Sequence, residues 1–381
     1  MFGRKIKNDG QPIKAERGTV DYSFLVLVLI ILTIGLVMMF SASYAYAYYY
    51  FDNSFHFITR QLFFAVIGVA AMLVVSFADY HWLRKFIPVL LAATFVLLVV
   101  VLFMPEINYV HRWINLGFIT FQPSEIAKFT IVLTYAHLIS VNYSKMKTFK
   151  YGILPFGVVL GPIVMLLVLE PHLSATVLIC AIGFIMMYVG GTSLKWFVPV
   201  GIVVLAFLAY AATNEEIIAY ASTRLAYWRD PFLDPQGAGY QTIQSLYAIS
   251  SGGLLGLGIG QSRQKYLYLP EPQNDFVFAV VCEELGFVGA VFIILLFALL
   301  IWRGFAIALK ARDRFGSMLA MGLTIQVGLQ VILNIAVVTK ILPNTGISMP
   351  FFSYGGTALL MLLAQMGVIL SVSRQSSLPK E

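Results

Sequence analysis

The stretch FLVLVLIILTIGLVMMF, residues 24–40, runs for 17 residues without a charged side chain. A helix of roughly 20 apolar residues crosses the hydrocarbon core of a bilayer and satisfies its own backbone hydrogen bonds there. Nine further charge-poor runs are long enough to do the same, at 62–77, 86–104, 118–139, 151–169, 173–189, 196–212, 276–302, 318–338 and 349–372. We therefore expect an all-α, polytopic membrane protein with about ten transmembrane helices.

The composition of the whole chain indicates the same class of protein. Of the 381 residues, 60% are hydrophobic and only 11% are charged, and the mean hydropathy is +0.85. Soluble chains are about a quarter charged, so this little polar surface cannot cover so many apolar side chains in water. Both cysteines, Cys180 and Cys282, lie in apolar runs, which gives no basis for a disulfide framework or a thiolate metal site.

The placement of basic residues predicts the orientation of the chain. With the N-terminus in the cytoplasm, 17 of the 25 Lys and Arg residues fall on the inner side and eight on the outer side. The positive-inside rule then places both termini in the cytoplasm. The first apolar run lacks the small-residue cleavage pattern of a signal peptide, so we expect it to be retained. The expected organisation is a tail at 1–21, one membrane domain at 22–373 and a tail at 374–381.

One long segment lies outside the expected spans, residues 214–274, on the outer side between the seventh and eighth spans. A loop of this length in a compact fold is usually functional or disordered. Residues 240–249 have an amphipathic pattern suited to a helix at the membrane interface. The Gly-rich stretch at 251–260 bends easily and offers backbone N–H groups to an anion, although a flexible linker explains it equally well.

Two ionisable residues stand inside the fourth expected span, where each costs about 2.5 to 3.5 kcal/mol on insertion scales. Glu125 and Lys128 are three residues apart, on one helix face, and can neutralise each other. Alternatively, Lys128 and Arg112, from the preceding outer segment, face a wet cavity and bind a phosphorylated substrate. Arg offers phosphate a planar fork and Lys offers it a point charge.

Asp275 ends the long outer segment and begins the eighth expected span. One interpretation makes it an N-cap or first-turn carboxylate, and the other makes it a general base at the mouth of the bundle. Glu283 and Glu284 lie about 12 Å deeper, rotated about 80° and 180° from Asp275, so neither forms a close carboxylate dyad with it. We expect one of these two glutamates to pair inside the bundle.

Two further polar stretches lie at the outer ends of spans. Glu170 and His172 stand at the turn between the fifth and sixth spans, where a lone His is more often a hydrogen-bonded helix-end residue than a metal ligand. Residues 345–356 open the last span and are rich in Gly, Ser and Pro. They permit a broken or re-entrant backbone, or a kinked helix end packed through small residues.

Several of these stretches together resemble one family, the SEDS proteins (shape, elongation, division and sporulation). The chain is similar to the FtsW and SpoVE type more than to RodA, and the resemblance covers nearly the whole chain. The motifs are RDPF at 229–232, GYQ at 239–241, QSLYAI at 244–249, KY at 265–266, LPEP at 269–272, NDFVFA at 274–279, EELG at 283–286, PNTG at 343–346 and SYGG at 353–356.

The resemblance implies a peptidoglycan glycosyltransferase that polymerises lipid II at the outer face of the bacterial cytoplasmic membrane, in division or sporulation. It implies Asp275 as the essential carboxylate, which deprotonates the 4-hydroxyl of the acceptor GlcNAc. That oxygen attacks the anomeric carbon of the donor MurNAc and expels the lipid diphosphate, with inversion. The implied partner is a class B penicillin-binding protein, within a divisome or elongation-type complex, and no nucleic acid partner is expected.

A leaving diphosphate requires cations at the outer depth of the membrane. We expect Arg112 and Lys128 in this role, with Glu125 beside them. Four more cations are available nearby, Arg224, Arg229, Arg263 and Lys265, and the motifs add Glu271 and Ser353 as expected cavity residues. Diphosphate chemistry often uses a divalent cation such as Mg or Mn, yet no ligand spacing marks a site, and no other cofactor is expected.

The chain departs from the family at Pro171-His172-Leu173-Ser174, where many relatives have an acid in place of the His, so we assign His172 no role. Two other functions fit the same residues. One is a lipid II transporter, which tolerates Asn at position 275, whereas a general base does not. The other is a non-catalytic scaffold, which leaves the polar residues at outer depth without an explanation.

Overall fold

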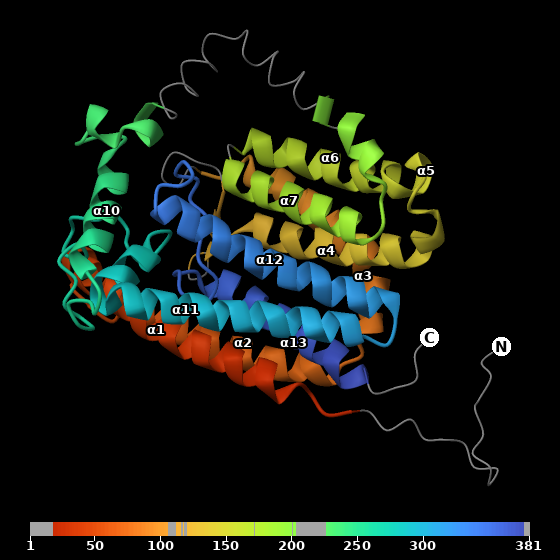
Figure 1. Ribbon diagram of the computed structural model, residues 1–381, viewed down its shortest axis with the longest axis horizontal. Helices are drawn as coiled ribbons and strands as arrows, with labels where there is room; N and C mark the ends of the chain where they lie inside the picture. Colours follow the sequence, from red (N-terminus) through yellow and green to blue (C-terminus); the bar gives the residue numbers. More distant parts are fainter. Residues whose placement is uncertain are drawn as a thin grey trace.

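A computed structural model of the protein describes residues 18–105, 112–115, 117, 120–170, 172–199, 201–202 and 226–376. The described helices are α1 (Tyr22–Phe51), α2 (His56–Phe77), α3 (Leu83–Val101), α4 (Pro123–Asn142), α5 (Phe149–Gly152), α6 (Leu154–Leu169), α7 (Leu173–Val189), α10 (Tyr240–Gly252), α11 (Val277–Lys310), α12 (Arg314–Val338) and α13 (Gly356–Gln375) (Figure 1). Two short strands, β1 (Ile114–Asn115) and β2 (Thr120–Phe121), pair antiparallel. The prediction of an all-α polytopic membrane protein is confirmed.

Seven helical segments of the described chain are long and apolar enough to cross a membrane. They comprise α1, α2, the segment Tyr80–Val101 with α3, the segment Phe149–Leu169 with α5 and α6, α11, α12 and α13. Helix α7 has the bounds expected for the sixth span, and α4 is 20 residues long with Glu125 and Lys128 in its first two turns. The expected span at 196–212 lies largely outside the described residues.

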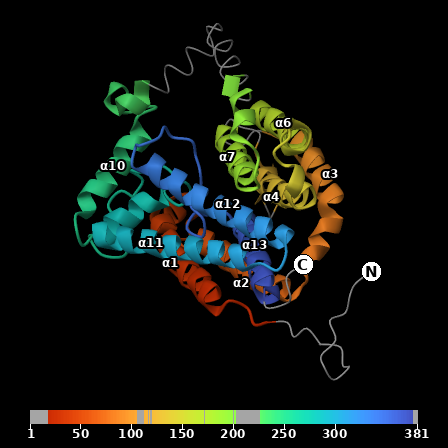
Figure 2. The same cartoon turned by 45° about the vertical axis from the view of Figure 1, so that its right-hand side comes forward.

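The helices form one bundle whose two ends differ. The first described residues and the end of α13 lie together at one end, which we call the terminal end, and α10 lies at the other, the α10 end (Figures 1 and 2). Helix α12 packs against α11 and α4, and α13 packs against α2. The most apolar window of α12 is 72% buried, whereas that of Tyr80–Val101 is 22% buried, so α12 runs through the core and α3 faces lipid.

The last span begins later than expected from its apolar residues. Helix α13 starts at Gly356, and residues 349–354 form turns instead of helix. Within these turns Phe351 has a φ of 67°, and the Ser353 hydroxyl accepts a hydrogen bond from the Met349 N–H at 2.8 Å. The interpretation of a broken backbone is confirmed, and a continuous kinked helix end is wrong, because a left-handed residue ends any helical path there.

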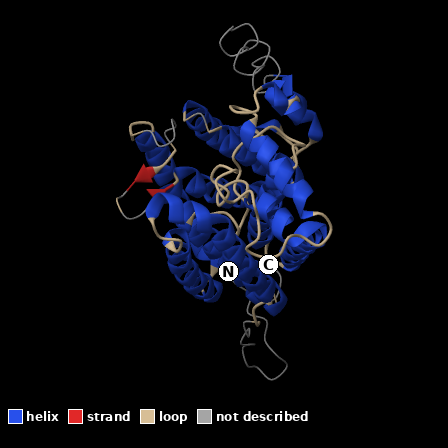
Figure 3. Ribbon diagram, turned by 90° about the vertical axis from the view of Figure 1, so that its left-hand side faces the viewer, coloured by secondary structure: helices blue, strands red, loops and turns tan. Residues whose placement is uncertain are grey.

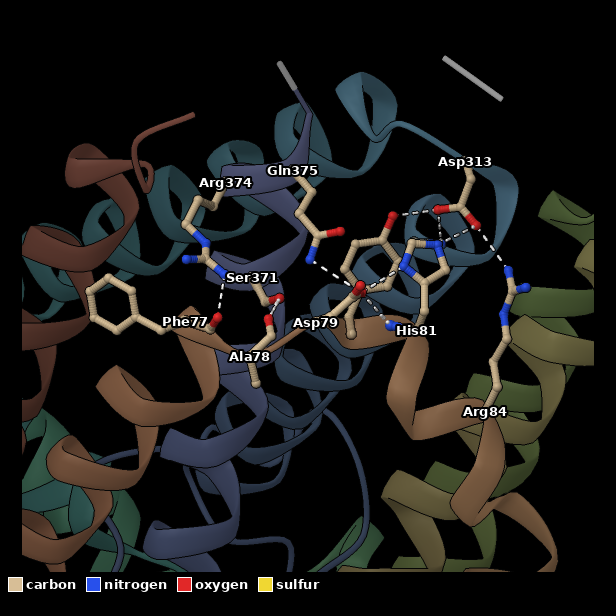
Figure 4. Close-up of polar contacts among 11 residues, drawn as sticks. Phe77, Ala78, Asp79, His81, Arg84, Asp313, Ser371, Arg374 and Gln375 are labelled. Carbon is tan, nitrogen blue, oxygen red and sulfur yellow. Dashed lines mark hydrogen bonds and ion pairs between the residues drawn. The ribbon is translucent and has the colours of Figure 1, made fainter. Parts of the chain in front are cut away.

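Asp313 joins three parts of the bundle at the terminal end (Figure 4). Its side chain caps α12 by accepting from the Gly316 N–H at 3.2 Å. It also accepts from the Tyr80 hydroxyl, pairs with Arg84 at 2.9 Å and lies 3.4 Å from the His81 ring. Burial by itself would raise the pKa of Asp313, but hydrogen bonds from His81 and Tyr80 outweigh it and lower the pKa to about 2.

A second set of bonds at the terminal end ties α13 to the end of α2 (Figure 4). The Ser371 hydroxyl donates to the Ala78 carbonyl at 2.6 Å, and the Arg374 guanidinium donates to the Phe77 carbonyl. Helix α2 ends at Phe77, and the last carbonyls of a helix have no partner within it. Side chains of α13 supply those partners, so specific polar contacts join α13 to the end of α2.

We predict that Asp313→Asn lowers the stability of the purified protein by about 1–3 kcal/mol, because Asn keeps the cap but loses the charge that Arg84 and the Tyr80 hydroxyl bind. The wild-type contribution is present above the ordinary Asp pKa of 3.8 and is lost as the pH falls toward 2. Thermal unfolding in detergent at pH 7 measures the loss. Asp52→Asn, at a left-handed residue that suits Asn, is the control, and equal midpoints for the two variants would contradict the assignment.

Candidate functional site

A cavity at the α10 end has a volume of about 390 Å³. It lies between α10, the turn that precedes α11 and the loop that follows α12, in the region where Figure 3 shows loop segments among the helices. We call it the main cavity. It is lined by Arg112, Tyr227, Trp228, Ala238, Gln241, Thr242, Asp275, Leu342, Pro343, Asn344, Thr345 and Gly346. The structure therefore brings together Asp275 and Arg112, which are 163 positions apart.

Asp275 occupies the turn before α11, and its side chain does not cap that helix. The N-cap residue of α11 is Phe276, which makes no side-chain cap bond. No described residue donates a hydrogen bond to the Asp275 carboxylate, so the N-cap interpretation is wrong. Burial, and to a smaller extent the Glu271 carboxylate, raise the pKa of Asp275, and Arg112 lowers it, which leaves the pKa at about 6. The carboxylate is free to accept a proton from a ligand in the main cavity.

Gly346 forms the wall between Asp275 and a second, smaller pocket. A Cβ on this residue would lie 3.1 Å from Asp275 Oδ2 and 3.8 Å from Ser174 Oγ, and its φ of +71° disfavours any side chain. Gly346 also lines the smaller pocket of about 40 Å³, which we call the inner pocket. The other residues of the inner pocket are Gln122, Ser124, Glu125, Lys128, His172, Ser174, Ala175, Leu178, Gln330, Ile347 and Ser348. Gly346 borders both cavities, and a side chain at this position would crowd the Asp275 carboxylate.

Glu125 and Lys128 form the internal ion pair that their spacing predicts. Lys128 Nζ lies 2.7 Å from Glu125 Oε1, with side-chain exposures of 4% and 12%. The pair lines the inner pocket, deeper than Asp275, and Lys128 is not part of the main cavity lining. An ammonium that is neutralised by its own neighbour presents a weaker attraction to an anion than a free one does.

Two titratable groups lie at the turn between α6 and α7. The His172 ring is within 3.3 Å of Gln122 Nε2, and His172 is the N-cap residue of α7 without a side-chain cap bond, which agrees with a hydrogen-bonded helix-end role. Burial lowers the pKa of His172 to about 3, with Arg112 and Lys128 adding to the effect. Burial raises the pKa of Glu170 to about 8, against the opposing charge of Arg112. Both side chains are therefore mostly neutral at pH 7.

The structure places Lys265 away from both cavities. Its Nζ lies 2.9 Å from Glu284 Oε1 and 3.0 Å from the Ser41 hydroxyl, and the residue is 2% exposed. The expectation that Lys265 lines the diphosphate site is not what the structure shows, because its charge is already neutralised in the core. Position in a loop at outer depth suggested an accessible cation, but the loop folds back into the bundle.

The loop after α10 folds back onto α11. Within the Gly-rich stretch, the N–H groups of Leu257 and Gly258 donate to the carbonyls of Glu283 and Glu284 at 3.0 Å each. Directly after it, the Glu283 carboxylate accepts from the N–H groups of Arg263 at 3.0 Å and Gln264 at 3.3 Å, and from the Ser262 hydroxyl. The anion that this loop binds is thus a side chain of α11, and its donors follow the Gly-rich stretch. Both glutamates are buried and bonded, whereas we expected one of them to pair, and the flexible-linker interpretation is wrong for the described part of the segment.

Of the remaining predicted residues, Glu271 lies near Asp275, and the other described ones do not line the main cavity. Glu271 is close enough to raise the pKa of Asp275 and accepts from Asn274 Nδ2 at 2.9 Å. Arg229 is exposed and only its carbonyl is engaged, by Lys340 Nζ at 3.3 Å. Ser353 closes the turn before α13 and is not among the main cavity residues. Arg263 is exposed away from both cavities, and Arg224 lies outside the described residues.

Sequence reasoning missed the polar rim of the main cavity. Asn344 Nδ2 donates to Gln241 Oε1 at 2.9 Å, which ties the loop after α12 to α10. Trp228 Nε1 donates to the Lys340 carbonyl at 3.2 Å and fixes an aromatic ring on the cavity wall. Gln241 and Asn344 belong to the motifs GYQ and PNTG, and membership of these motifs was the sequence signal that could have identified them as cavity residues. The described residues include no cluster of three or more His, Cys, Asp or Glu side chains that would hold a metal ion.

The model of the cell cycle protein family of FtsW, RodA and SpoVE matches residues 22–378. The chain belongs to this family. It is 41% identical to stage V sporulation protein E of Bacillus subtilis (strain 168), over 86% of this chain and 89% of that protein. It is 38% identical to the probable peptidoglycan glycosyltransferase FtsW of Geobacter sp. (strain M18), over 85% of this chain and 88% of that protein.

Solved structures of family members have the same fold. A chain of the structure described as "Structural coordination of polymerization and crosslinking by a peptidoglycan synthase complex" is 30% identical, with a TM-score of 0.77, and the match covers 94% of this chain and 98% of that one. The rod shape determining protein RodA of Thermus thermophilus is 27% identical, with a TM-score of 0.68, over 93% and 97% of the two chains. The resemblance inferred from the motifs is confirmed.

We predict that Lys128→Met destabilises the protein by about 3 kcal/mol or more, because it leaves the Glu125 carboxylate buried without its partner. The double variant Lys128→Met with Glu125→Gln recovers most of that loss, since neither charge remains. Thermal unfolding of the single and double variants measures the coupling. Additive losses would contradict a structural ion pair, and a stable double variant with impaired activity would assign Lys128 a role in binding the substrate as well.

Proposed function

We propose that this chain is a peptidoglycan glycosyltransferase, which polymerises lipid II into glycan strands with Asp275 as its general base. The observation that carries the proposal is a carboxylate with no hydrogen-bond donor among the described residues, set in the wall of a cavity that also contains Arg112. Membership of the family and the glycosyltransferase name of relatives such as the Geobacter FtsW support it.

The proposed reaction uses the two charges of the main cavity in sequence. The Asp275 carboxylate takes the proton of the acceptor 4-hydroxyl, and the acceptor oxygen forms a bond to the anomeric carbon of the donor sugar. The bond from that carbon to the lipid diphosphate breaks, and the diphosphate leaves with the electron pair. Arg112 is positioned to stabilise the charge that grows on it. A pKa of about 6 makes Asp275 a stronger base than an ordinary Asp, yet keeps it mostly ionised at pH 7.

We further propose that the α10 end faces the outside of the cytoplasmic membrane and the terminal end faces the cytoplasm. The excess of Lys and Arg in the segments assigned to the inner side supports this orientation. It places the main cavity at outer depth, where the polyprenyl tail of lipid II stays in the bilayer while its sugars enter the cavity. Residues 22–373 act as the membrane domain, with 214–274 as its outer loop.

The proposed partner is a class B penicillin-binding protein that cross-links the strands this chain makes. The similarity to a chain of a peptidoglycan synthase complex, described as coordinating polymerization and crosslinking, supports the pairing. A divalent cation would bind with the diphosphate itself, which brings its own oxygen ligands.

Replacement of Asp275 by Asn tests the proposal, because the amide keeps the shape of the side chain but cannot accept the proton. We expect the purified Asp275→Asn variant, in complex with its transpeptidase partner, to make less than about 1% of the wild-type glycan polymer from labelled lipid II. Asp52→Asn, an exposed change at a residue that does not line the main cavity, is the control and retains full activity. Undiminished polymer from Asp275→Asn would exclude Asp275 as the general base, and a wild-type complex that makes no polymer would favour a transporter or a scaffold.

The pH dependence of polymerisation gives a second test. A general base acts only when it is deprotonated, so we expect the rate to be flat above an apparent pKa of about 6 and to fall tenfold per pH unit below it. Glu271→Gln removes a neighbouring negative charge, so it shifts this acid limb toward lower pH without abolishing activity. A rate that stays constant down to pH 4.5, with the protein folded, would show that no group with the pKa of Asp275 controls the reaction.

A further inference from the structure

Asn334 is a polar residue buried where the sequence shows only an apolar span. It belongs to α12, and its exposed fraction is 0%. Gln326 and Gln330 precede it by eight and four residues, so the three amides form one stripe along the helix, and all three are buried. A neutral amide in a membrane helix needs partners within the protein. The partners of Asn334 identify what it does.

The Asn334 amide nitrogen binds two carbonyls that belong to opposite sides of the site. Nδ2 donates to the Asp275 carbonyl at 2.8 Å and to the Ile347 carbonyl at 2.6 Å. Both partners accept only, so the nitrogen of the amide must face them and its orientation is fixed. One side chain thus bridges the turn that carries Asp275 and the loop that follows α12.

The bridged loop is the wall against which Asp275 lies. Gly346, the residue before Ile347, approaches the Asp275 carboxylate so closely that a Cβ would lie 3.1 Å from Oδ2. Neither segment is helical at these residues, so neither has a helical ladder to hold its position. The Asp275 turn has one further tie to the α13 entry, the bond from the Tyr354 N–H to the Gln273 carbonyl at 2.8 Å. Asn334 therefore controls how the Asp275 side chain stands relative to the main cavity.

We propose that Asn334 is a positioning residue, which sets the Asp275 carboxylate and the Gly346 wall at the geometry that the polymerisation reaction requires. Two N–H donors on one short, neutral side chain are the specific requirement. Leu, of similar volume, supplies none and Ser supplies one. A Lys or Arg would bring a positive charge to the base and weaken it. The inference rests on the proposed function, since it assigns Asn334 a part in the same reaction.

The test compares Asn334→Leu and Asn334→Ser in the complex with the transpeptidase partner, using labelled lipid II. For a displaced base we expect Asn334→Leu to lower kcat about 30- to 100-fold, Asn334→Ser less, and KM to change by less than about threefold. We also expect the acid limb of the pH profile to move to lower pH in Asn334→Leu. The freed turn lets water reach the carboxylate, while the neighbouring Glu271 and Arg112 stay in place.

Controls separate positioning from general damage to the helix. Thr324→Val removes a buried hydroxyl of the same helix that bonds only the Ala320 carbonyl, and we expect unchanged kcat and pH profile. If Asn334→Leu does not fold, Asn334→Ser decides the question. Normal kcat and pH profile in the folded Asn334 variants would overturn the inference, and so would a loss that Thr324→Val reproduces. Asp275→Asn is measured alongside them, because full polymer from that variant rejects the proposed general base itself, whatever the Asn334 variants show.

Discussion

Inside a bilayer a backbone N–H or C=O has no water to bond, so non-helical chain persists there only where the protein supplies its partners. This constraint accounts for several of the buried polar side chains among the described residues. Glu283 binds the backbone of the loop after α10, Asn334 binds the carbonyls on two sides of the main cavity, and Ser353 closes the turn before α13. In the sequence, these residues look like unexplained polar side chains in an apolar chain. In the structure, they bond the non-helical backbone of the membrane domain.

The same constraint separates the two ends of the bundle. At the terminal end, Asp313 and the side chains of α13 satisfy helix ends. At the α10 end, the loops leave a cavity with the Asp275 carboxylate and the Arg112 guanidinium on its wall.

Hydropathy predicted the helices well, because lipid demands length and apolarity and both are visible in sequence. The start of α13 was missed because Met349 and Phe352 are as apolar in a buried turn as in a helix. Spacing predicted the Glu125–Lys128 pair, since its members are one helical turn apart. The pairing of Lys265 with Glu284 depends on a loop that folds back onto α11, and the spacing of the two residues along the chain does not indicate this fold.

The main cavity was only partly predictable for a related reason. Asp275 and Arg112 were singled out because a charge at membrane depth is costly and therefore noticeable. Asn334, Gln241 and Asn344 are neutral, and a single amide in an apolar run attracts no attention until its partners are known. The cavity is formed by segments that are far apart in the chain. Its charged residues can be predicted from the sequence because each is costly at membrane depth, but its uncharged polar residues cannot.

The most direct measurement is a structure of the complex with its transpeptidase partner and a bound lipid II analogue. The account predicts that the acceptor sugar lies in the main cavity with its 4-hydroxyl within about 3.2 Å of the Asp275 carboxylate, and that the diphosphate contacts Arg112. An analogue bound with its sugars away from this cavity, and with no ligand atom near Asp275, would contradict it.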